Sequence, residues 1–313
     1  MKKWWWFCFG LGLTGVGVLG ARSFAQPDMN GVAVHMVVTV EAHKGPTVPV
    51  VNREDVLVNE GRERDKVTGW VPATGEHAGL EYFILLDDSS TASLARQLAD
   101  LKNFIDAQPG TAKIGLAYMR NGTAVIEQNL TTDHALVASK LRLPMGIAAG
   151  DASPYFALTD LLKRWPASGN RREVLMATDG IDHYYGGGDM LDPYLSAAIE
   201  DAQRAEVVVS GIYTPGIGHF GHSYWRTYWG QLYLARLAED TGGEAYYIGF
   251  TGSPVTFTPY LDDQASRLNH QYLLTFLAKP QKKAGLRPVK IKTEVPNAEL
   301  VSASQVFVPA EPQ

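Results

Sequence analysis

A carboxylate and two hydroxyls stand at alternate positions directly after an apolar stretch of the sequence. The stretch runs from Phe83 to Leu86, and Asp87, Ser89 and Thr91 then form a D-x-S-x-T pattern. In an extended turn, alternate residues can point to the same side, so the pattern offers three oxygen donors at one place. Hard oxygen donors suit Mg²⁺, Mn²⁺ or Ca²⁺. The pattern therefore predicts a site for a divalent cation.

A second carboxylate follows another apolar stretch, because Val174 to Thr178 leads into Asp179 and Gly180. The carboxyl ends of neighbouring parallel strands meet at one edge of a sheet, where such sheets bind ligands. An Asp-Ser-Ser-Thr cluster is also a good helix N-cap, and a single cluster of this kind is more often a cap than a metal site. The second carboxylate, Asp179, favours the metal site over capping.

Two regular patterns indicate which elements position these residues. From about residue 81 to residue 247, apolar stretches of strand length alternate with segments of helical periodicity, as is typical of a parallel sheet covered by helices. Strands are expected over residues 82–86, 113–118, 124–128, 173–178, 206–213 and 245–248. Helices are expected over residues 94–105, 155–165, 195–205 and 231–239. We predict an α/β fold with a doubly wound, mostly parallel sheet.

The segments on both sides of this block are rich in β patterns. Two or three strands are expected between residues 31 and 71, and after a helix over residues 260–269 further strands are expected over 272–276, 289–293 and 300–308. We expect the two flanks to pair into one small β domain. The predicted organisation is a signal peptide (1–25), an N-terminal β segment (26–79), an α/β domain (80–250) and a helix with a C-terminal β segment (251–313).

The first residues have the pattern of a secretory signal peptide. Lys2 and Lys3 precede an apolar stretch over residues 4–19, and Ser23-Phe24-Ala25 resembles a cleavage site. The stretch is shorter than the roughly 20 residues that span a bilayer, so we predict no retained transmembrane helix. The expected location is secreted, periplasmic or in the cell envelope. Cys8, the single cysteine, lies in this segment, so the mature chain would have no thiol chemistry.

Charge and missing motifs exclude several function classes. The chain carries 28 Lys and Arg against 33 Asp and Glu, a net charge of -5, and its basic residues are dispersed. This disfavours nucleic acid as a partner. The sequence has no P-loop, no G-x-S-x-G and no G-x-G-x-x-G after a first strand, so the NTPase, α/β-hydrolase and dinucleotide-binding classes lack their motifs.

Residues 81–250 resemble the von Willebrand factor type A (VWA) domain and its metal-ion-dependent adhesion site. Besides D-x-S-x-T, residues 171–180 (RREVLMATDG) look like the family's strand with T-D-G, and residues 237–243 (LAEDTGG) look like its last helix and glycine stop. The flanking β segments also look like an exported subgroup described mainly in acidobacteria. The resemblance implies a cation, Mg²⁺ or else Mn²⁺ or Ca²⁺, bound by Asp87, Ser89, Thr91, a loop hydroxyl and Asp179.

The family's loop residue is a threonine, and this sequence departs from the pattern there. Matching the following helix to residues 155–158 places Ala152 or Ser153 at that position. We predict Ser153 as the ligand, with Asp151 as an alternative donor. Asp88, between the motif residues, is a possible extra acid but is expected to point away, and Asp182 and Asp189 are expected to be solvated turn residues.

Aromatic residues near the predicted site are candidates for contact with a partner. We predict Tyr184 and Tyr185 in one loop, and His219, His222, Tyr224 and Trp225 in another, as partner-binding residues. Exposed Trp and Tyr are enriched in interface hot spots. The alternative is that they cover the neighbouring β domain. The two histidines have H-x-x-H spacing, which is a weak zinc signal without the glutamate and helix of H-E-x-x-H.

These features predict an exported, non-enzymatic binding module. Resemblance to the VWA family implies that a bound cation accepts an Asp or Glu carboxylate from a protein partner. Two alternatives remain open: a metal-dependent hydrolase that uses the cation or the histidine pair to activate water, and a structural envelope subunit with a vestigial metal site. The sequence specifies neither the partner nor the oligomeric state.

Overall fold

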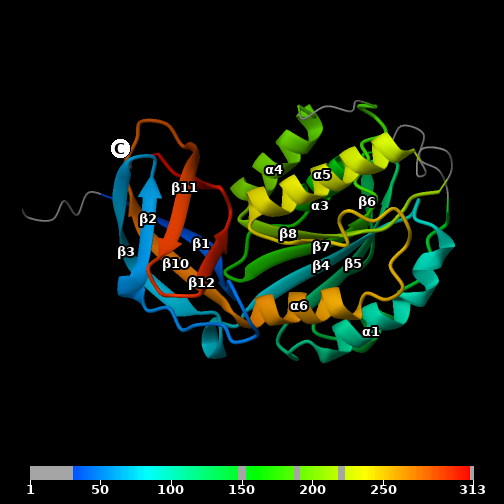
Figure 1. Ribbon diagram of the computed structural model, residues 1–313, viewed down its shortest axis with the longest axis horizontal. Coiled ribbons are helices and arrows are strands. Elements are labelled where there is room, and N and C mark those ends of the chain that lie inside the picture. Colours follow the sequence, from blue (N-terminus) through cyan, green and yellow to red (C-terminus); the bar gives the residue numbers. More distant parts are fainter. Residues whose placement is uncertain (1–30, 147–152, 187–190, 218–222, 311–313) are drawn as a thin grey trace, which may run out of the picture. The chain divides into compact units, whose positions relative to one another are not determined.

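A computed structural model of the protein describes residues 31–146, 153–186, 191–217 and 223–310 (Figure 1). The predicted signal peptide therefore lies outside the described residues. Within those four ranges, no helix combines the length and the apolar character needed to cross a bilayer.

A six-stranded sheet forms the centre of the α/β part. Its strands have the order β6-β5-β4-β7-β8-β9, and only the pairing of β5 with β6 is antiparallel. The strands are β4 (Leu80–Asp87), β5 (Lys113–Arg120), β6 (Thr123–Thr131), β7 (Arg171–Thr178), β8 (Val207–Tyr213) and β9 (Ala245–Tyr246). Because the chain proceeds from β4 to β5 on one side and later to β7 on the other, strand order reverses at β4. This confirms the predicted doubly wound, mostly parallel sheet.

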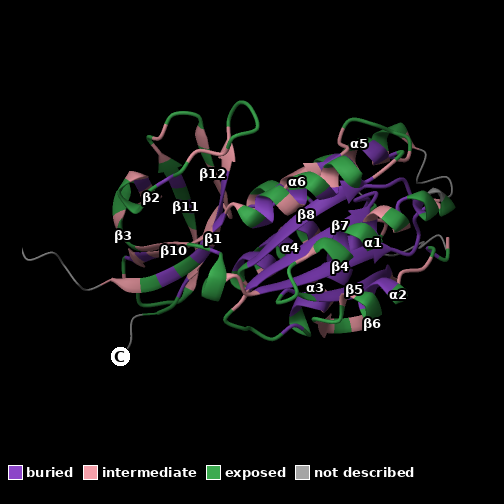
Figure 2. Ribbon diagram, turned by 90° about the horizontal axis from the view of Figure 1, so that it is seen from below, coloured by how far each residue is buried: buried purple, intermediate pink, exposed green. Residues whose placement is uncertain are grey.

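Helices cover both faces of this sheet. The helices are α1 (Leu98–Ala107), α2 (His134–Ser139), α3 (Pro154–Lys163), α4 (Pro193–Arg204), α5 (Tyr224–Thr241) and α6 (Thr258–Asn269), with short 3₁₀ helices η1 (Arg53–Asp55), η2 (Gly75–His77) and η3 (Ala92–Arg96). Alternate residues of β4 face opposite cores: Tyr82, Ile84 and Leu86 pack with α1, α2 and α6, whereas Phe83 and Leu85 pack with α3, α4 and α5. Burial on both faces explains the continuous apolar stretches, as the buried strands in Figure 2 show.

The flanking segments pair into a seven-stranded antiparallel sheet with the order β12-β1-β10-β3-β2-β11-β13. Its strands are β1 (Val32–Ala42), β2 (Val56–Glu60), β3 (Glu63–Pro72), β10 (Gln271–Ala278), β11 (Gly285–Thr293), β12 (Ala298–Ser302) and β13 (Gln305–Val308). Val34, Met36, Val38 and Val40 alternate into its core, as the period of two predicts. Pairing of β1 with β10 and β12 confirms that the two flanks form one β structure.

Several elements differ from the sequence prediction, and the helix expected over residues 94–105 is the 3₁₀ helix η3 followed by α1. The single strand expected over residues 300–308 is two strands, because Ser304 between them donates its hydroxyl to Asp240 Oδ1 at 2.8 Å and its N–H to the Asp240 carbonyl. Helix α5 begins at Tyr224 rather than near residue 231. The short helix α2 has too few residues for a clear periodicity and was not predicted; its N-cap is Asp133.

Candidate functional site

Asp87 lies at the carboxyl end of β4, beside the end of β7, where strand order reverses. The residue is 9% exposed, and its carboxylate accepts three hydrogen bonds. Oδ1 accepts from the N–H of Ser89 at 2.8 Å and from its hydroxyl at 2.6 Å, and Oδ2 accepts from the Thr178 hydroxyl at 2.7 Å. The local turn and the neighbouring strand therefore fix the orientation of this carboxylate.

Asp179 follows directly after β7 and is 2% exposed. Its Oδ1 accepts a hydrogen bond from the N–H of Ile181 at 2.9 Å. Its Oδ2 is buried and accepts no hydrogen bond from any residue that the structure describes; Nε2 of His183 is 3.9 Å away. A buried carboxylate oxygen without a donor is costly, so this atom is suited to bind a cation.

The electrostatics of the two carboxylates favour the same conclusion. Burial raises the pKa of Asp87, and the charge of Asp179 raises it further, against the hydrogen bonds from Ser89 and Thr178. For His183, burial lowers the pKa, but contact with Asp179 and the charge of Asp87 outweigh it, so the pKa is raised. Two buried negative charges near one another repel, and a bound divalent cation would remove that cost.

The loop after β8 holds the D-x-S-x-T turn in place. The N–H of Ile217 donates to the carbonyl of Ser89 at 3.0 Å, and the N–H of Thr91 donates to the carbonyl of Pro215 at 3.2 Å. Gly216 lies against the carboxylate of Asp179, since a Cβ added there would be 2.4 Å from Oδ2. Only glycine permits this close approach, so the loop carries no side chain at the position next to Asp179.

A cleft brings together three of the five predicted ligands: Asp87, Ser89 and Ser153. Thr91 and Asp179 do not line this cleft. Thr91 stands at the N-cap position of η3, but its side chain makes no capping hydrogen bond there. Asp151 and Ala152, the alternatives to Ser153, lie outside the described residues.

Ser153 is the N-cap residue of α3 and is 1% exposed. Its hydroxyl accepts from the N–H of Tyr155 at 3.2 Å and donates to Asp182 Oδ2 at 2.8 Å. The prediction that Asp182 is solvated is wrong, because Asp182 is 3% exposed and also accepts from the N–H of Tyr185. These hydrogen bonds take the place of the hydrogen bonds to water that an exposed turn residue would make. Asp189 lies outside the described residues.

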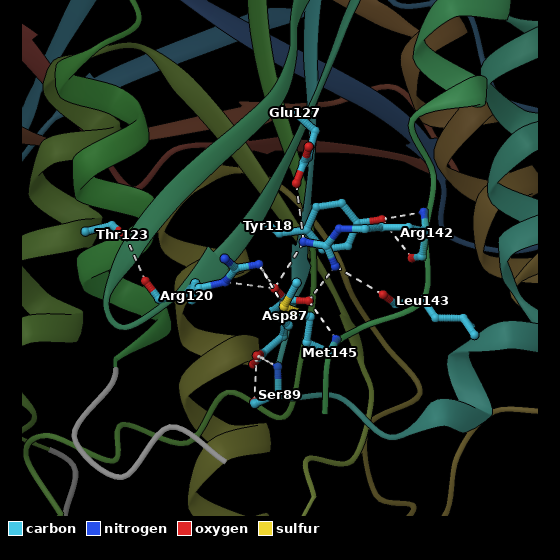
Figure 3. A network of polar contacts seen from close by, with 10 residues as sticks. Asp87, Ser89, Tyr118, Arg120, Thr123, Glu127, Arg142, Leu143 and Met145 are labelled. Atoms are coloured by element: carbon cyan, nitrogen blue, oxygen red, sulfur yellow. Dashed lines mark hydrogen bonds and ion pairs between the residues drawn. The ribbon is translucent and has the colours of Figure 1, made fainter. Parts of the chain in front are cut away.

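Asp88 has a role that sequence reasoning missed. Its buried carboxylate binds two arginines: Nη1 of Arg142 donates to Oδ1 and Nη2 of Arg120 donates to Oδ2, both at 2.7 Å. Burial raises the pKa of Asp88, but hydrogen bonds from Arg142, the N–H of Met145 and Arg120 outweigh it and hold the pKa below its usual range. Figure 3 shows the two arginines approaching from different elements. The side chain is directed to these groups, and Asp88 is an anchor rather than a spare acid.

The aromatic residues of the predicted rim are largely exposed. Tyr184, Tyr224 and Trp225 have exposed fractions of 55%, 68% and 69%, whereas Tyr185 is half-buried. The alternative that Tyr224 and Trp225 cover the β sheet is therefore wrong. His219 and His222 lie outside the described residues, so their predicted role is untested.

The donor set fits a hard cation better than a soft one. In the part of the chain that the structure describes, no three side chains of the types His, Cys, Asp and Glu are grouped so that they could hold a metal ion. A site here would instead use the two buried carboxylates with serine and threonine hydroxyls. Oxygen donors of this kind suit Mg²⁺, Mn²⁺ or Ca²⁺, and Oδ2 of Asp179, which accepts no hydrogen bond from the described residues, agrees with this assignment.

No protein-family model matches the sequence, and no curated protein matches it. Several solved structures are similar to parts of the chain. An aerotolerance-related membrane protein from Bacteroides fragilis is 16% identical, with 61% of this chain and 99% of that chain covered and a TM-score of 0.44. The human COPII-coat protein Sec24c is 9% identical (74% and 44% covered, TM-score 0.42), and the SpRpn10 VWA domain is 12% identical (53% and 85% covered, TM-score 0.31).

These identities and TM-scores assign no function to the chain. The fold class follows from its strand order and pairing. The resemblance to an exported VWA subgroup stays a prediction.

Proposed function

We propose that this chain is a protein-binding module whose site holds a divalent cation and binds a carboxylate of a partner protein. Asp87, Ser89, Thr91, Ser153 and Asp179 would hold the ion, which is Mg²⁺ or else Mn²⁺ or Ca²⁺. The observation that carries the proposal is the buried pair Asp87 and Asp179 at neighbouring strand ends, with Oδ2 of Asp179 lacking a donor among the described residues. Such a pair is expensive without a counter-charge, and His183, whose Nε2 is 3.9 Å from Asp179 Oδ2, supplies one only in its protonated form.

The cation would supply attraction for an external carboxylate. Two carboxylates would balance the divalent charge only formally, and the three hydroxyls are neutral donors, so the ion would remain a Lewis acid that an Asp or Glu of a partner could bind at an open position. The chain's own contribution is to orient the ligands: Thr178 fixes Asp87, and Asp182 fixes Ser153. The exposed rings of Tyr184, Tyr224 and Trp225 would contact the rest of the partner.

Export is part of the proposal. It is supported by the basic, apolar and small-residue pattern of residues 1–25. N-terminal sequencing of the protein from its native host tests it, and a chain that retains Met1 would contradict removal of this segment.

The cation site is tested by thermal unfolding in EDTA and then in graded Mg²⁺, Mn²⁺ and Ca²⁺. A ligand of the native state stabilises it by about 2.7 kcal/mol at one hundred times its Kd, so even weak binding becomes visible at millimolar cation. The rise should disappear in Asp87→Asn and Asp179→Asn. Asp100→Asn is the matched control, because Asp100 is a partly buried carboxylate on α1 that accepts hydrogen bonds from Thr256 and Phe257.

The carboxylate function is tested separately with acetate as the probe. Acetate should bind the Mn²⁺-loaded protein and should not bind it in EDTA, as isothermal titration would measure. If the protein bound the metal ion but no acetate, the ion would not bind carboxylates, and this result would contradict the proposed protein-binding function.

A further inference from the structure

Arg120 ends β5 and lines the same cleft as Asp87, Ser89 and Ser153. Its guanidinium donates to Asp88 Oδ2 from Nε at 3.1 Å and from Nη2 at 2.7 Å. Asp88 occupies the second position of the D-x-S-x-T pattern, directly between two predicted ligands. The turn that would hold the cation therefore also holds a positive side chain beside it.

The backbone of Arg120 is fixed by a tight hairpin. Asn121 and Gly122 connect β5 to β6 with φ values of 49° and 71°, as a two-residue turn of type I′ requires. The Thr123 hydroxyl donates to the carbonyl of Arg120 at 2.8 Å (Figure 3). Arg120 is therefore held at both its backbone and its side chain, and a ligand would lose little free energy in ordering it.

Asp88 does not depend on Arg120 alone. Arg142 contacts both oxygens of Asp88, at 2.7 and 3.1 Å, and the N–H of Met145 donates to Oδ1 at 2.9 Å. Arg142 also pairs with Glu127 at 3.3 Å and lies over the ring of Tyr118 at 3.8 Å. Arg142 and Met145 thus hold Asp88 in place without Arg120, so Asp88 keeps its orientation when Arg120 contacts another group.

Arg120 also has donors available for another group. Its side chain is 35% exposed, the largest exposure in this ion-pair network of Asp88, Glu127, Arg120 and Arg142. Among the residues that the structure describes, none accepts a hydrogen bond from Nη1 of Arg120. Nη2 also contacts Met145 Sδ at 3.1 Å, so the two N–H groups of Nη1 are the donors that remain for a carboxylate in the cleft.

We propose that Arg120 is a specificity-determining residue that pairs with a second acidic group of the partner, next to the carboxylate bound at the cation. The partner segment would carry two carboxylates close together, one for the ion and one for Arg120. This inference rests on the proposed function, because the first carboxylate needs the ion. A purely structural Arg120 would hold the hairpin to Asp88 and would make no distinction between partners.

Two probes of nearly equal size distinguish these roles: succinate, with two carboxylates, and monomethyl succinate, with one. Each is titrated into the full-length protein loaded with Mn²⁺. We expect the wild type to bind succinate about tenfold more tightly than the monoester, which is the gain of one charge-assisted pair. In Arg120→Gln this preference should fall below about twofold when both probes are compared at a Mn²⁺ concentration that saturates the variant.

Two variants control for the fold. Arg120→Lys keeps the charge without the planar fork and should retain part of the preference. Arg164→Gln removes an arginine of similar exposure that pairs with Asp160 on α3, and should leave the preference intact.

Three results would overturn the inference. An equal loss of both probes in Arg120→Gln would make Arg120 a purely structural residue, and an unchanged preference would remove it from recognition. If the wild type binds no Mn²⁺, the proposed function itself fails, and this is seen before any probe is added.

Discussion

The hydroxyl of Thr178 donates a hydrogen bond of 2.7 Å to Oδ2 of Asp87 and so joins the carboxyl ends of β7 and β4. The same oxygen of Thr178 accepts from the N–H of Gly180 at 3.2 Å. Thr178 therefore positions both the first carboxylate and the turn that carries Asp179. Its side chain is fully buried, so water cannot replace it.

Thr178→Val keeps the shape of the side chain and removes the hydroxyl. We expect a loss of about 1–3 kcal/mol in unfolding free energy, since Asp87 Oδ2 is left without this donor, and a lower affinity for Mn²⁺. Urea unfolding in EDTA measures the first effect and isothermal titration the second. Thr178→Ser retains the hydroxyl and should preserve most of the unfolding free energy and most of the affinity for Mn²⁺. Equal behaviour of the Val and Ser variants would disprove a role for this hydrogen bond.

Helix α5 contacts the Asp179 turn through glycine. A Cβ on Gly230 would lie 2.3 Å from the carbonyl oxygen of Asp179, and one on Gly180, which has φ +70°, would lie 2.3 Å from the carbonyl oxygen of Gly230. In a helix, replacing glycine by alanine normally stabilises by roughly 0.5–1 kcal/mol. Here Gly230→Ala should destabilise by about 1–3 kcal/mol and weaken Mn²⁺ binding, because backbone atoms must move.

Gly110→Ala is the control for that prediction, because nothing lies within 4 Å of a Cβ added there. It should be neutral or slightly stabilising in the same urea experiment. A stabilising effect of Gly230→Ala would show that α5 does not press on the turn.

The aromatic residues at the start of α5 divide into exposed and packed ones. Tyr224 and Trp225 are mostly exposed, whereas Trp229 packs against the core and against Tyr233 at a ring distance of 6.0 Å. Trp225→Ser should change the unfolding free energy by less than about 0.5 kcal/mol, and Trp229→Ala should cost about 3 kcal/mol. Equal losses in chemical denaturation would mean that Trp225 is a structural residue and not a free surface for a partner.

The parts predicted from sequence are those with a strong local signal. The strand ending at Asp87 is a continuous apolar run, and Gly242 ends α5 with φ +84° as the T-G-G segment indicated. Pairing of the two flanks was predicted from their common β pattern, although their register was not, since register depends on contacts between segments far apart in the chain.

The parts that could not be predicted depend on long-range polar contacts. The arginines on Asp88 come from 32 and 54 residues away, and no periodicity relates those positions. In the sequence, Asp182 has the pattern of a solvated turn residue. Its hydrogen bond with Ser153 depends on the N-terminus of α3, which lies beside it only in the fold. One signal was available for Asp88: an acid next to a buried strand end needs a partner, and few basic residues lie near it in the predicted sheet.

The β2–β3 hairpin provides a pH test that is independent of the site. Burial raises the pKa of Asp65 to about 6, and the charges of Glu60 and Glu63 add to the shift. The unfolded value is about 3.9, so the folded state binds the proton more tightly, and its stability should fall as pH rises from about 4 to about 6.

Asp65→Asn removes this titration. Because Asp65 is half-buried and solvent screens its charge, we expect a gain of order 1 kcal/mol above pH 6 and little change at pH 4. Urea unfolding in EDTA at several pH values gives the slope directly. Glu60→Gln keeps Asp65 but removes a neighbouring charge, and should shift the fall in stability to lower pH. If the unfolding free energies of the wild type and Asp65→Asn changed with pH in the same way, the pKa of Asp65 would be equal in the folded and unfolded states. The acidic residues of the hairpin would then not lower the stability of the folded state.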